Sequence, residues 1–377
     1  MEFSFTEEQK LIKNAAHDFL EKECPSDLVR EMEEDHRGYS LDLWRKMAEL
    51  GWLGLIFPAK YGGSEGIFLD LIVLLEEMGR YLAPVPFLPT VILGGVSILS
   101  AGTEKQKQEF LPIIVKGELI LTMALIESDL NYDASGVDLQ VIREGDLFVI
   151  NGTKLFVPYA HVANCLICAT RTKNSARKED GITLFLIEGK NPEVSFTMLK
   201  TIAYDKYCEV VFNRAKVREE NILGKYHEGW EIIKKVLEQM AIAQCALMVG
   251  GAERVLEMTV DYAKKRVQFG RPIGSFQAIQ HRCANMKIDL DGAKFITYEA
   301  AWKISQGFSC SLEVSVAKAW VNQAYQRICA HGHQIYGGIG VMKDEEMQLY
   351  SRRAKSTEFL FGDTNFHREI VAQQLGL

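Results

Sequence analysis

The hydrophobic pattern of this 377-residue chain changes its period twice, and this change limits the possible folds more than any other feature. Through residues 1–118, apolar side chains recur every three to four residues, as on one face of a helix. Residues 119–225 form short runs rich in Val, Ile, Leu, Phe and Thr between Gly, Asn and Asp turns, which is typical of strands. Helical spacing returns over residues 226–377. The pattern predicts an α+β protein with an N-terminal helical domain, a middle β-sandwich or barrel, and a C-terminal four-helix bundle.

Individual elements can be placed within this outline. Thr6 and Gln9 have the spacing of a capping box, so the first helix is expected to continue from there through Glu21. The other helices expected in the first part are Leu41–Leu50, Phe68–Tyr81, Thr90–Ser100 and Glu104–Val115. The expected strands are Leu119–Ile126, Gln140–Arg143, Leu147–Lys154, Asn164–Arg171, Gly181–Glu188 and Glu209–Val217. The bundle helices are expected at Trp230–Val267, Phe276–Gln306, Leu312–Tyr336 and Lys343–Glu358.

Charge and composition exclude several classes of protein. The formal net charge is −7 and no basic run stands out, so nucleic acid is not an expected partner. The N-terminus lacks the basic segment and apolar core of a signal peptide. Prolines 84, 86 and 89 interrupt the uncharged run Tyr81–Thr103, which leaves too short a helix for a membrane span. We therefore expect a cytoplasmic protein.

The cysteines and histidines show no metal-binding pattern. Cys165 and Cys168 form a CxxC motif, but they lie in an expected strand, where residues three apart point to opposite faces. Reduced thiols are the expectation for all eight cysteines. His331 and His333, two apart on an expected helix, point their rings in different directions. We expect no metal.

Two glycine breaks interrupt the C-terminal helices. The first, Gly337-Gly338, ends the third bundle helix, and the second, Phe361-Gly362-Asp363-Thr364, precedes a last helix. Such breaks free backbone N–H groups, which suit a phosphate or the polar edge of a ring. Helix-packing turns that bind no ligand explain the same pattern, and the breaks alone do not separate these alternatives.

Three motifs resemble the acyl-CoA dehydrogenase family of flavoproteins: Arg266 to Ile273 (RVQFGRPI), Gln334 to Gly340, and Asn151-Gly152-Thr153-Lys154. The resemblance covers nearly the whole chain and implies the same order of helices, strands and helices. It also implies an FAD cofactor, an acyl-CoA substrate, an electron-transfer flavoprotein or similar electron acceptor, and a homotetramer or a heterotetramer with a related subunit. The FAD contacts that the resemblance implies are Arg266, Gln268, Phe269, Gln277, Gln334, Gly337, Gly338, Thr364, Ile126, Phe156 and Pro158. For Arg266 the alternative is a surface or interface ion pair.

The catalytic base is where the sequence departs from the family. The usual base is a glutamate in a Tyr-Glu-Gly-Thr-like turn, and its position falls on Phe361, or on Gly362 if one residue is inserted. Some members carry the base on the first long bundle helix, where this chain has Met240. Asp363 is the nearest carboxylate. It is either a relocated base or an N-cap of the last helix.

The expected flavin and acyl contacts differ as well. A Thr-Glu-Pro-like loop is usual after the first strand, and here that loop begins with Ile126. Phe156 and Pro158 replace a usual tryptophan and threonine, and proline offers neither a hydroxyl nor an N–H. By resemblance the acyl group would lie against four residues: Tyr132, Met240, Phe361 and Gly362.

These observations leave three functions open. The first is FAD-dependent α,β-dehydrogenation of an acyl-CoA, in a catabolic sequence like β-oxidation, with an unusual base and a cyclic or branched acyl group. The second is a non-catalytic partner subunit of a heteromeric dehydrogenase. The third is a flavin enzyme of the same fold that acts on another substrate, because a fold does not fix a function.

Overall fold

The structure is a computed structural model that describes residues 5–377, and these residues separate into two compact units. The sheet unit comprises Met32–Gly66 and Pro84–Met240. The bundle unit comprises Ile67–Ala83, Ala241–Leu377 and the described part of Met1–Glu31. The expected N-terminal domain is thus shared between the two units, and its boundary at residue 118 stays a prediction.

The sheet unit contains two four-stranded sheets. Their strands are β1 (Leu121–Ala124), β2 (Val141–Glu144), β3 (Leu147–Pro158), β4 (Cys165–Arg171), β5 (Ile182–Glu188), β6 (Val194–Leu199), β7 (Tyr207–Arg218) and β8 (Ile222–Leu223). One sheet has the order β1-β4-β5-β8, with β1 and β4 parallel, and the other has the order β2-β3-β7-β6. The rings of Phe148 on β3 and Phe185 on β5 lie 5.1 Å apart, so the inner faces of the two sheets meet. The expected small sandwich is confirmed.

Strand β4 explains the CxxC motif. All seven of its residues are buried, as expected for a strand covered on both faces. Cys165 and Cys168 lie on it as free thiols, and burial raises the pKa of each to about 12. These thiols are therefore protonated and inert at neutral pH.

The uncharged run after Tyr81 forms a buried π-helical segment, η3 (Leu88–Val96), which continues into α5 (Ser97–Ala101). A Cβ at Gly94 would lie 2.6 Å from Leu121 Cβ, so this glycine lets η3 approach strand β1 closely. The neighbouring helices α3 (Leu41–Glu49) and α6 (Glu104–Val115) have the expected positions. None of the helices within residues 5–377 has both the length and the apolar character needed to cross a bilayer.

The bundle unit consists of helices from both ends of the chain. They are α1 (Glu7–Glu23), α4 (Phe68–Arg80), most of α7 (Trp230–Lys265), α8 (Gln277–Ser305), α9 (Ser311–Tyr336), α10 (Glu346–Thr357) and α11 (Thr364–Gln374). The Thr6 capping box at the start of α1 is confirmed. Helix α2 (Ser26–Glu34), strands β6 and β8, and a hairpin between α7 and α8 were not expected from the sequence.

Close packing and a buried ionic network hold this unit together. A Cβ at Gly79 on α4 would lie 2.0 Å from Leu247 O, and a Cβ at Gly250 on α7 would lie 1.8 Å from Glu76 O. Only glycine at both places allows α4 and α7 to approach so closely. The Glu76 carboxylate is wholly buried and binds the ammonium groups of Lys13 at 2.5 Å and Lys294 at 2.7 Å. Burial by itself raises the pKa of Glu76, but Lys294 and Lys13 together lower it below its ordinary value.

Candidate active site

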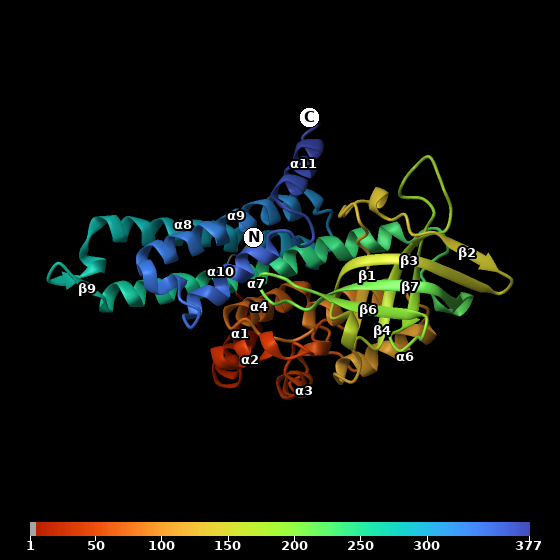
Figure 1. The fold of residues 1–377 in the computed structure, drawn as a ribbon, viewed down its shortest axis with the longest axis horizontal. Coiled ribbons are helices and arrows are strands. Elements are labelled where there is room, and N and C mark those ends of the chain that lie inside the picture. The colour runs from red at the N-terminus through yellow and green to blue at the C-terminus, as the bar shows by residue number, and fades with distance from the viewer. Residues whose placement is uncertain (1–4) are drawn as a thin grey trace. The chain divides into compact units, whose positions relative to one another are not determined.

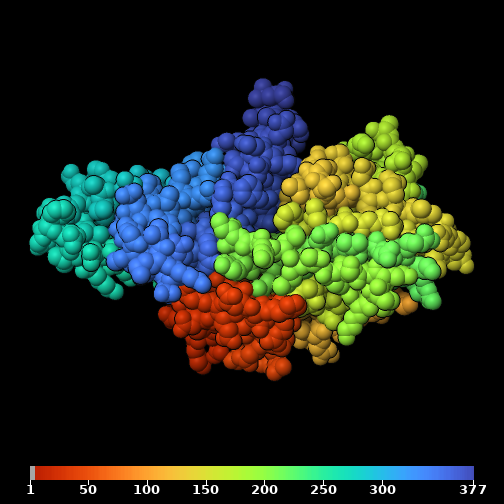
Figure 2. Space-filling view, viewed as in Figure 1, coloured from red at the N-terminus to blue at the C-terminus, as the bar shows by residue number. Residues whose placement is uncertain are grey.

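A short hairpin projects from the end of the bundle unit where α7 and α8 meet (Figure 1). Its strands are β9 (Val267–Gln268) and β10 (Arg271–Pro272), and they are joined by Phe269 at φ 53° and Gly270 at φ 80°. Positive φ at both central residues is the geometry of a tight hairpin turn. The Phe269 side chain is 91% exposed, and the space-filling view shows the teal residues near 270 at the outer end of this part of the chain (Figure 2).

Arg266 begins this hairpin with a fixed backbone and an uncommitted side chain. Its N–H donates to Tyr262 O at 2.8 Å, and its carbonyl accepts from Ile273 N at 2.8 Å. Its side chain is exposed and has no hydrogen-bond or ion-pair partner within residues 5–377. The surface ion pair considered from the sequence is therefore not formed within the described chain. Gln268 and Gln277 are exposed beside it.

The first glycine break lies at the same end of the bundle. Helix α9 ends at Gly337 with φ 65°, and the short segment η8 (Gly337–Val341) follows. The Tyr336 ring stacks on Tyr262 with centroids 4.2 Å apart, and its hydroxyl donates to Met258 O at 3.2 Å. Tyr262 lies one turn before Arg266, near the end of α7, and Tyr336 is the last residue of α9. The stacked rings therefore join the ends of these two helices. A Cβ at Gly337 or Gly338 would meet nothing within 4 Å, so this backbone is open to a ligand. Gln334 is exposed one turn before it.

The second glycine break, between α10 and α11, is tightly constrained. Phe361 has φ 58° and Gly362 has φ 96°. Asp363 caps α11, since its Oδ1 accepts from Phe366 N at 2.8 Å. Its Oδ2 has no hydrogen-bond partner among residues 5–377. The first residue of α11, Thr364, is only 7% exposed, and its hydroxyl has no hydrogen-bond partner in that part of the chain.

Two buried side chains bind the carbonyl groups of this turn. Lys318 on α9 donates to Thr357 O at 3.3 Å, Gly362 O at 3.2 Å and Asn322 Oδ1 at 2.6 Å. His367 Nε2 donates to Phe361 O at 2.9 Å, and its Nδ1 lies 3.3 Å from the Ser315 hydroxyl. Burial lowers the pKa of His367 to about 4, so the ring is neutral at pH 7 and Nδ1 accepts from Ser315.

The sheet unit holds the remaining expected flavin contacts. Leu155 N donates to Ile126 O at 2.8 Å, which joins the loop after β1 to β3. Phe156 lies at the β-bulge of β3 with φ 51° and is 41% exposed, so its ring is available to a planar ligand. Pro158 ends β3 opposite Tyr207. At these positions neither Phe156 nor Pro158 offers a hydroxyl.

A buried ion pair fixes the loop that follows β1. Lys154 is wholly buried, and its ammonium donates to Glu127 Oε1 at 2.6 Å and Leu125 O at 2.9 Å. The same oxygen of Glu127 accepts from Asp138 N and Leu139 N at 3.0 Å. This loop carries Tyr132, one of the expected acyl contacts, and another, Met240, is buried on α7.

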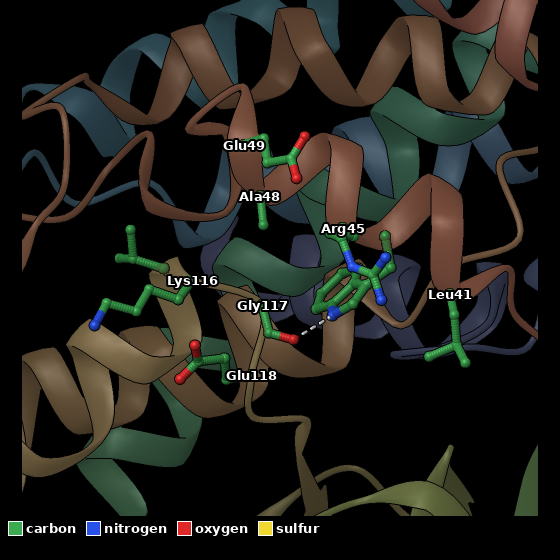
Figure 3. Close-up of a pocket in the computed structure, with 9 residues that line it drawn as sticks. Leu41, Arg45, Ala48, Glu49, Lys116, Gly117 and Glu118 are labelled. Carbon is green, nitrogen blue, oxygen red and sulfur yellow. Dashed lines mark hydrogen bonds between the residues drawn. The ribbon is translucent and has the colours of Figure 1, made fainter.

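A pocket lies in another part of the sheet unit. It has a volume of about 540 Å³ and lies between α3 and the end of α6, with Arg45, Glu49, Lys116 and Glu118 among the residues that line it (Figure 3). Trp44 also lines it, and its indole donates to Gly117 O at 2.9 Å. None of the expected site residues lines it. Across residues 5–377, no cluster of three or more His, Cys, Asp or Glu side chains is arranged to bind a metal ion.

The sequence-based interpretation missed three residues that order these loops: Glu127, Lys318 and His367. Lys318 had a detectable signal, because it lies on the buried stripe of α9 with Val314, Ala317 and Val321. A lysine on an apolar stripe must find buried acceptors. No comparable pattern marks Glu127 or His367, whose partners are backbone groups of nearby loops.

Comparisons with known proteins agree with this architecture. Models of the acyl-CoA dehydrogenase N-terminal, middle and C-terminal domains match residues 6–118, 122–215 and 227–376. The probable acyl-CoA dehydrogenase YngJ of Bacillus subtilis (strain 168) is 31% identical, with 100% of each chain covered.

Solved structures give the same result. The chain matches butyryl-CoA dehydrogenase from Megasphaera elsdenii with a TM-score of 0.93 at 30% identity, with 100% of each chain covered. It matches the ChsE4-ChsE5 complex from Mycobacterium tuberculosis with a TM-score of 0.91 at 28% identity, over 100% of this chain and 99% of that one. Since the relatedness extends over the full length in sequence and in structure, this chain belongs to the acyl-CoA dehydrogenase family of flavoproteins, oxidoreductases that act on CH–CH groups.

Proposed function

We propose that this chain binds FAD and removes two hydrogens from the α and β carbons of an acyl-CoA thioester, with Asp363 as the base. The observation that carries the proposal is the exposed Arg266 side chain, without a partner in the described chain, at the end of the bundle unit where the Gly337 and Gly338 backbone is open. A chain that no longer bound a flavin would need neither the free Arg266 side chain nor the open glycine backbone.

The residues of the bundle unit fit the phosphate side of FAD. An arginine without a partner offers bidentate hydrogen bonds to a phosphate, and a glycine turn without nearby side chains lets backbone N–H groups approach one. Gln268, Phe269, Gln277 and Gln334 would border the same ligand. The buried Thr364 hydroxyl, which has no partner in the described chain, is a further group that a bound cofactor would satisfy.

The sheet unit offers an apolar wall for the ring system. Phe156 is exposed at the bulge, and Ile126 lies beside it through the hydrogen bond to Leu155. With Pro158 in place of a hydroxyl-bearing residue, the polar edge of a flavin would depend on backbone groups for its hydrogen bonds. Bound FAD supplies the acceptor for the hydride that leaves the β carbon.

Asp363 would take the proton from the α carbon. Its Oδ1 is committed to the cap of α11, whereas Oδ2 is uncommitted. A carboxylate in this role contributes about a hundredfold to ten-thousandfold to the rate. When the proton moves to Asp363 and the hydride leaves, a double bond forms between the two carbons and the substrate is oxidised by two electrons.

The altered base position favours an altered acyl group. The carboxylate must reach the carbon next to the thioester carbonyl, so a base moved by one or two residues fits an acyl chain held differently. We propose a cyclic or branched acyl group, for which the family resemblance implies Tyr132, Met240, Phe361 and Gly362 as contacts. Phe361 and Met240 both place apolar side chains where relatives carry carboxylates, which suits a bulky hydrocarbon.

Exposed apolar side chains support an oligomer. Ile288 and Phe295 on α8 are 67% and 48% exposed, and Val316 and Trp320 on α9 are 40% and 41% exposed. Apolar surface of this kind is typical of subunit interfaces. We propose a tetramer built from copies of this chain or from this chain and a related one. An electron-transfer flavoprotein or similar acceptor would reoxidise the cofactor, and the free thiols of all eight cysteines fit the cytoplasm.

Steady-state turnover with a dye acceptor tests the substrate class. Straight-chain, branched and cyclic acyl-CoA esters are compared, with the corresponding free acids as controls. We expect turnover with a branched or cyclic ester and none with the acids. Turnover of the free acids would instead show a flavin enzyme acting on another substrate, and preference for straight chains would refute the acyl assignment.

A second function is favoured by the missing carboxylates at Phe361 and Met240 and by Pro158. In this alternative the chain is a non-catalytic subunit that completes the flavin site of a related, catalytic chain. The similarity to one chain of the ChsE4-ChsE5 complex supports it. Such a chain would be inactive alone and would gain activity on co-purification with a relative that carries the glutamate. A homo-oligomer that turns over an ester without that relative would exclude it.

A further inference from the structure

Lys318 is a buried cation that pairs with no carboxylate within residues 5–377, although the nearby charges of Glu358 and Asp363 favour its protonated form. Its side chain is wholly buried in the middle of α9, and it forms no salt bridge to any carboxylate within residues 5–377. Its ammonium instead donates to the Asn322 side chain and to backbone carbonyls at Thr357 and Gly362, with Glu358 O at 3.5 Å. Burial lowers the pKa of Lys318 to about 8, so the group is mostly protonated at pH 7.

The acceptors share one location. Thr357 is the last residue of α10, Glu358 is its C-cap, and Gly362 lies in the turn that follows. The last carbonyls of a helix lack intrahelical partners and carry partial negative charge. A cation placed against them satisfies these groups and is itself stabilised, so Lys318 acts as a tertiary C-cap for α10.

The turn that Lys318 binds has an unfavourable backbone. Phe361 has φ 58°, a left-handed conformation that is unfavourable for a non-glycine residue. Such a conformation persists only where surrounding contacts over-determine it. Here Lys318 holds Gly362 O from α9, and His367 holds Phe361 O from α11. Two consecutive carbonyls are therefore fixed, directly before Asp363.

We propose that Lys318 is a positioning residue, whose ammonium holds the turn from Glu358 to Asp363 so that the Asp363 carboxylate meets the reacting carbon. The proposal rests on the proposed function for its catalytic consequence. The structural part of the proposal does not depend on that function. It says that Lys318, and not the packing of the bundle as a whole, orders this turn.

The experiment compares two methionine variants by hydrogen–deuterium exchange of the full chain. Lys318→Met removes the ammonium but keeps a long apolar side chain. Lys294→Met is the control, because it removes a partly exposed ammonium of the bundle unit, one that binds Glu76 and Glu253 and not the turn. We expect about tenfold faster exchange at the amides of residues 360–364 in Lys318→Met, from the loss of hydrogen bonds to a charged group. The same amides should be unchanged in Lys294→Met.

A kinetic comparison adds a readout that a general loss of stability does not produce. For any ester that the wild-type chain oxidises, Lys318→Met should lower kcat about a hundredfold while KM changes less than about threefold, as for a misplaced base. Lys294→Met should keep kcat. If the wild type oxidises no ester, the proposed function fails, and the exchange result still decides the role of Lys318.

Asn322→Ser provides a second variant in case Lys318→Met does not fold. It removes the acceptor of the ammonium and the donor to Glu358 O, and should speed exchange at residues 358–362 to a smaller extent. Unchanged exchange at the turn in the folded variants would overturn the proposal. Equal acceleration throughout the bundle in both methionine variants would also overturn it, since Lys318 would then be a structural residue only.

Discussion

The two glycine breaks of the bundle unit follow helices in the same way but differ in what surrounds them. Gly337 and Gly362 both have positive φ, at 65° and 96°. A Cβ at Gly337 would meet nothing within 4 Å, whereas one at Gly362 would lie 2.4 Å from Phe366 Cδ1 and 2.7 Å from His367 Nε2. One glycine keeps backbone open for a ligand and the other permits close internal packing. The same sequence signal therefore marks two different environments, an open backbone and a packed one, at two places in one chain.

We propose that the open break serves binding and the packed break serves catalysis. The open break lies with an uncommitted Arg266, as a phosphate site requires. At the packed break, Lys318 donates to Gly362 O and His367 Nε2 donates to Phe361 O. Neither Phe361 nor Gly362, the two positions at which the family resemblance places the base, carries a carboxylate. Asp363 Oδ2 is the one carboxylate oxygen there without a hydrogen-bond partner in the described chain. The predictions below test whether the packed break still performs chemistry.

The largest effect is expected from Asp363→Asn. Asparagine caps a helix as well as aspartate does but cannot accept the α proton, so stability should change little while turnover falls about a hundredfold to ten-thousandfold. Thermal unfolding and steady-state rates measure the two quantities. Asp363→Ala is the companion variant, and it should lose about 1 kcal/mol of stability in addition, because it removes the cap. Undiminished turnover in Asp363→Asn would assign the aspartate to capping alone.

Alanine at each glycine tests the comparison itself. Gly362→Ala should destabilise the unit by about 2 to 4 kcal/mol, since a positive φ penalty adds to overpacking against Phe366 and His367. Gly337→Ala should cost only the backbone penalty of roughly 1 to 3 kcal/mol, because φ 65° with ψ −143° is a conformation essentially confined to glycine. Denaturant unfolding without cofactor measures both. Equal losses would show that the two breaks do not differ as described.

The packed break should also make stability depend on pH. The pKa of His367 is about 4 in the folded chain and 6.5 when the ring is exposed, because burial disfavours the charged form. Between these values the unfolded chain binds a proton that the folded chain does not, so the free energy of unfolding falls as pH drops from about 6.5 to about 4. The full loss is about 3 kcal/mol. His367→Gln, whose amide can still donate to Phe361 O, should show a flatter dependence, and an unaltered slope would refute the assignment.

Arg266→Ala tests the open break. It should weaken FAD binding about tenfold to a hundredfold, because it removes a charge-assisted hydrogen bond to phosphate. Arg271→Ala is a suitable control from the same hairpin. Its guanidinium already lies 4.1 Å from the centre of the Phe276 ring, so its loss should change cofactor affinity much less. Fluorescence titration of the cofactor-free chain with FAD provides the measurement. Similar losses in the two variants would show that Arg266 has no special role.

Sequence periodicity predicted the layered fold well because most elements bury one continuous apolar face. Helix α6 lies at Glu104–Val115, as expected, and α8 and α9 begin and end within one residue of expectation. Strand β6 was missed because most of its residues are not buried. Strands β9 and β10 were missed because two residues are too few to show an alternating pattern.

The site was less predictable because its order comes from tertiary contacts. That Lys318 meets the carbonyls after α10 depends on how α9 packs against residues some 40 positions later. The N-cap alternative for Asp363 was recognisable from the sequence, and the structure forms that cap. Whether the same carboxylate also accepts a proton depends on its free oxygen and a bound substrate, and neither leaves a pattern in the sequence.

The most direct test of the central claim is the visible spectrum of the chain purified alone, recorded anaerobically before and after adding a panel of acyl-CoA esters. The account predicts a yellow protein that a branched or cyclic ester bleaches, since the cofactor accepts the hydride. A colourless protein, or a yellow one that no ester bleaches, would contradict it and identify the chain as a subunit that needs a catalytic partner.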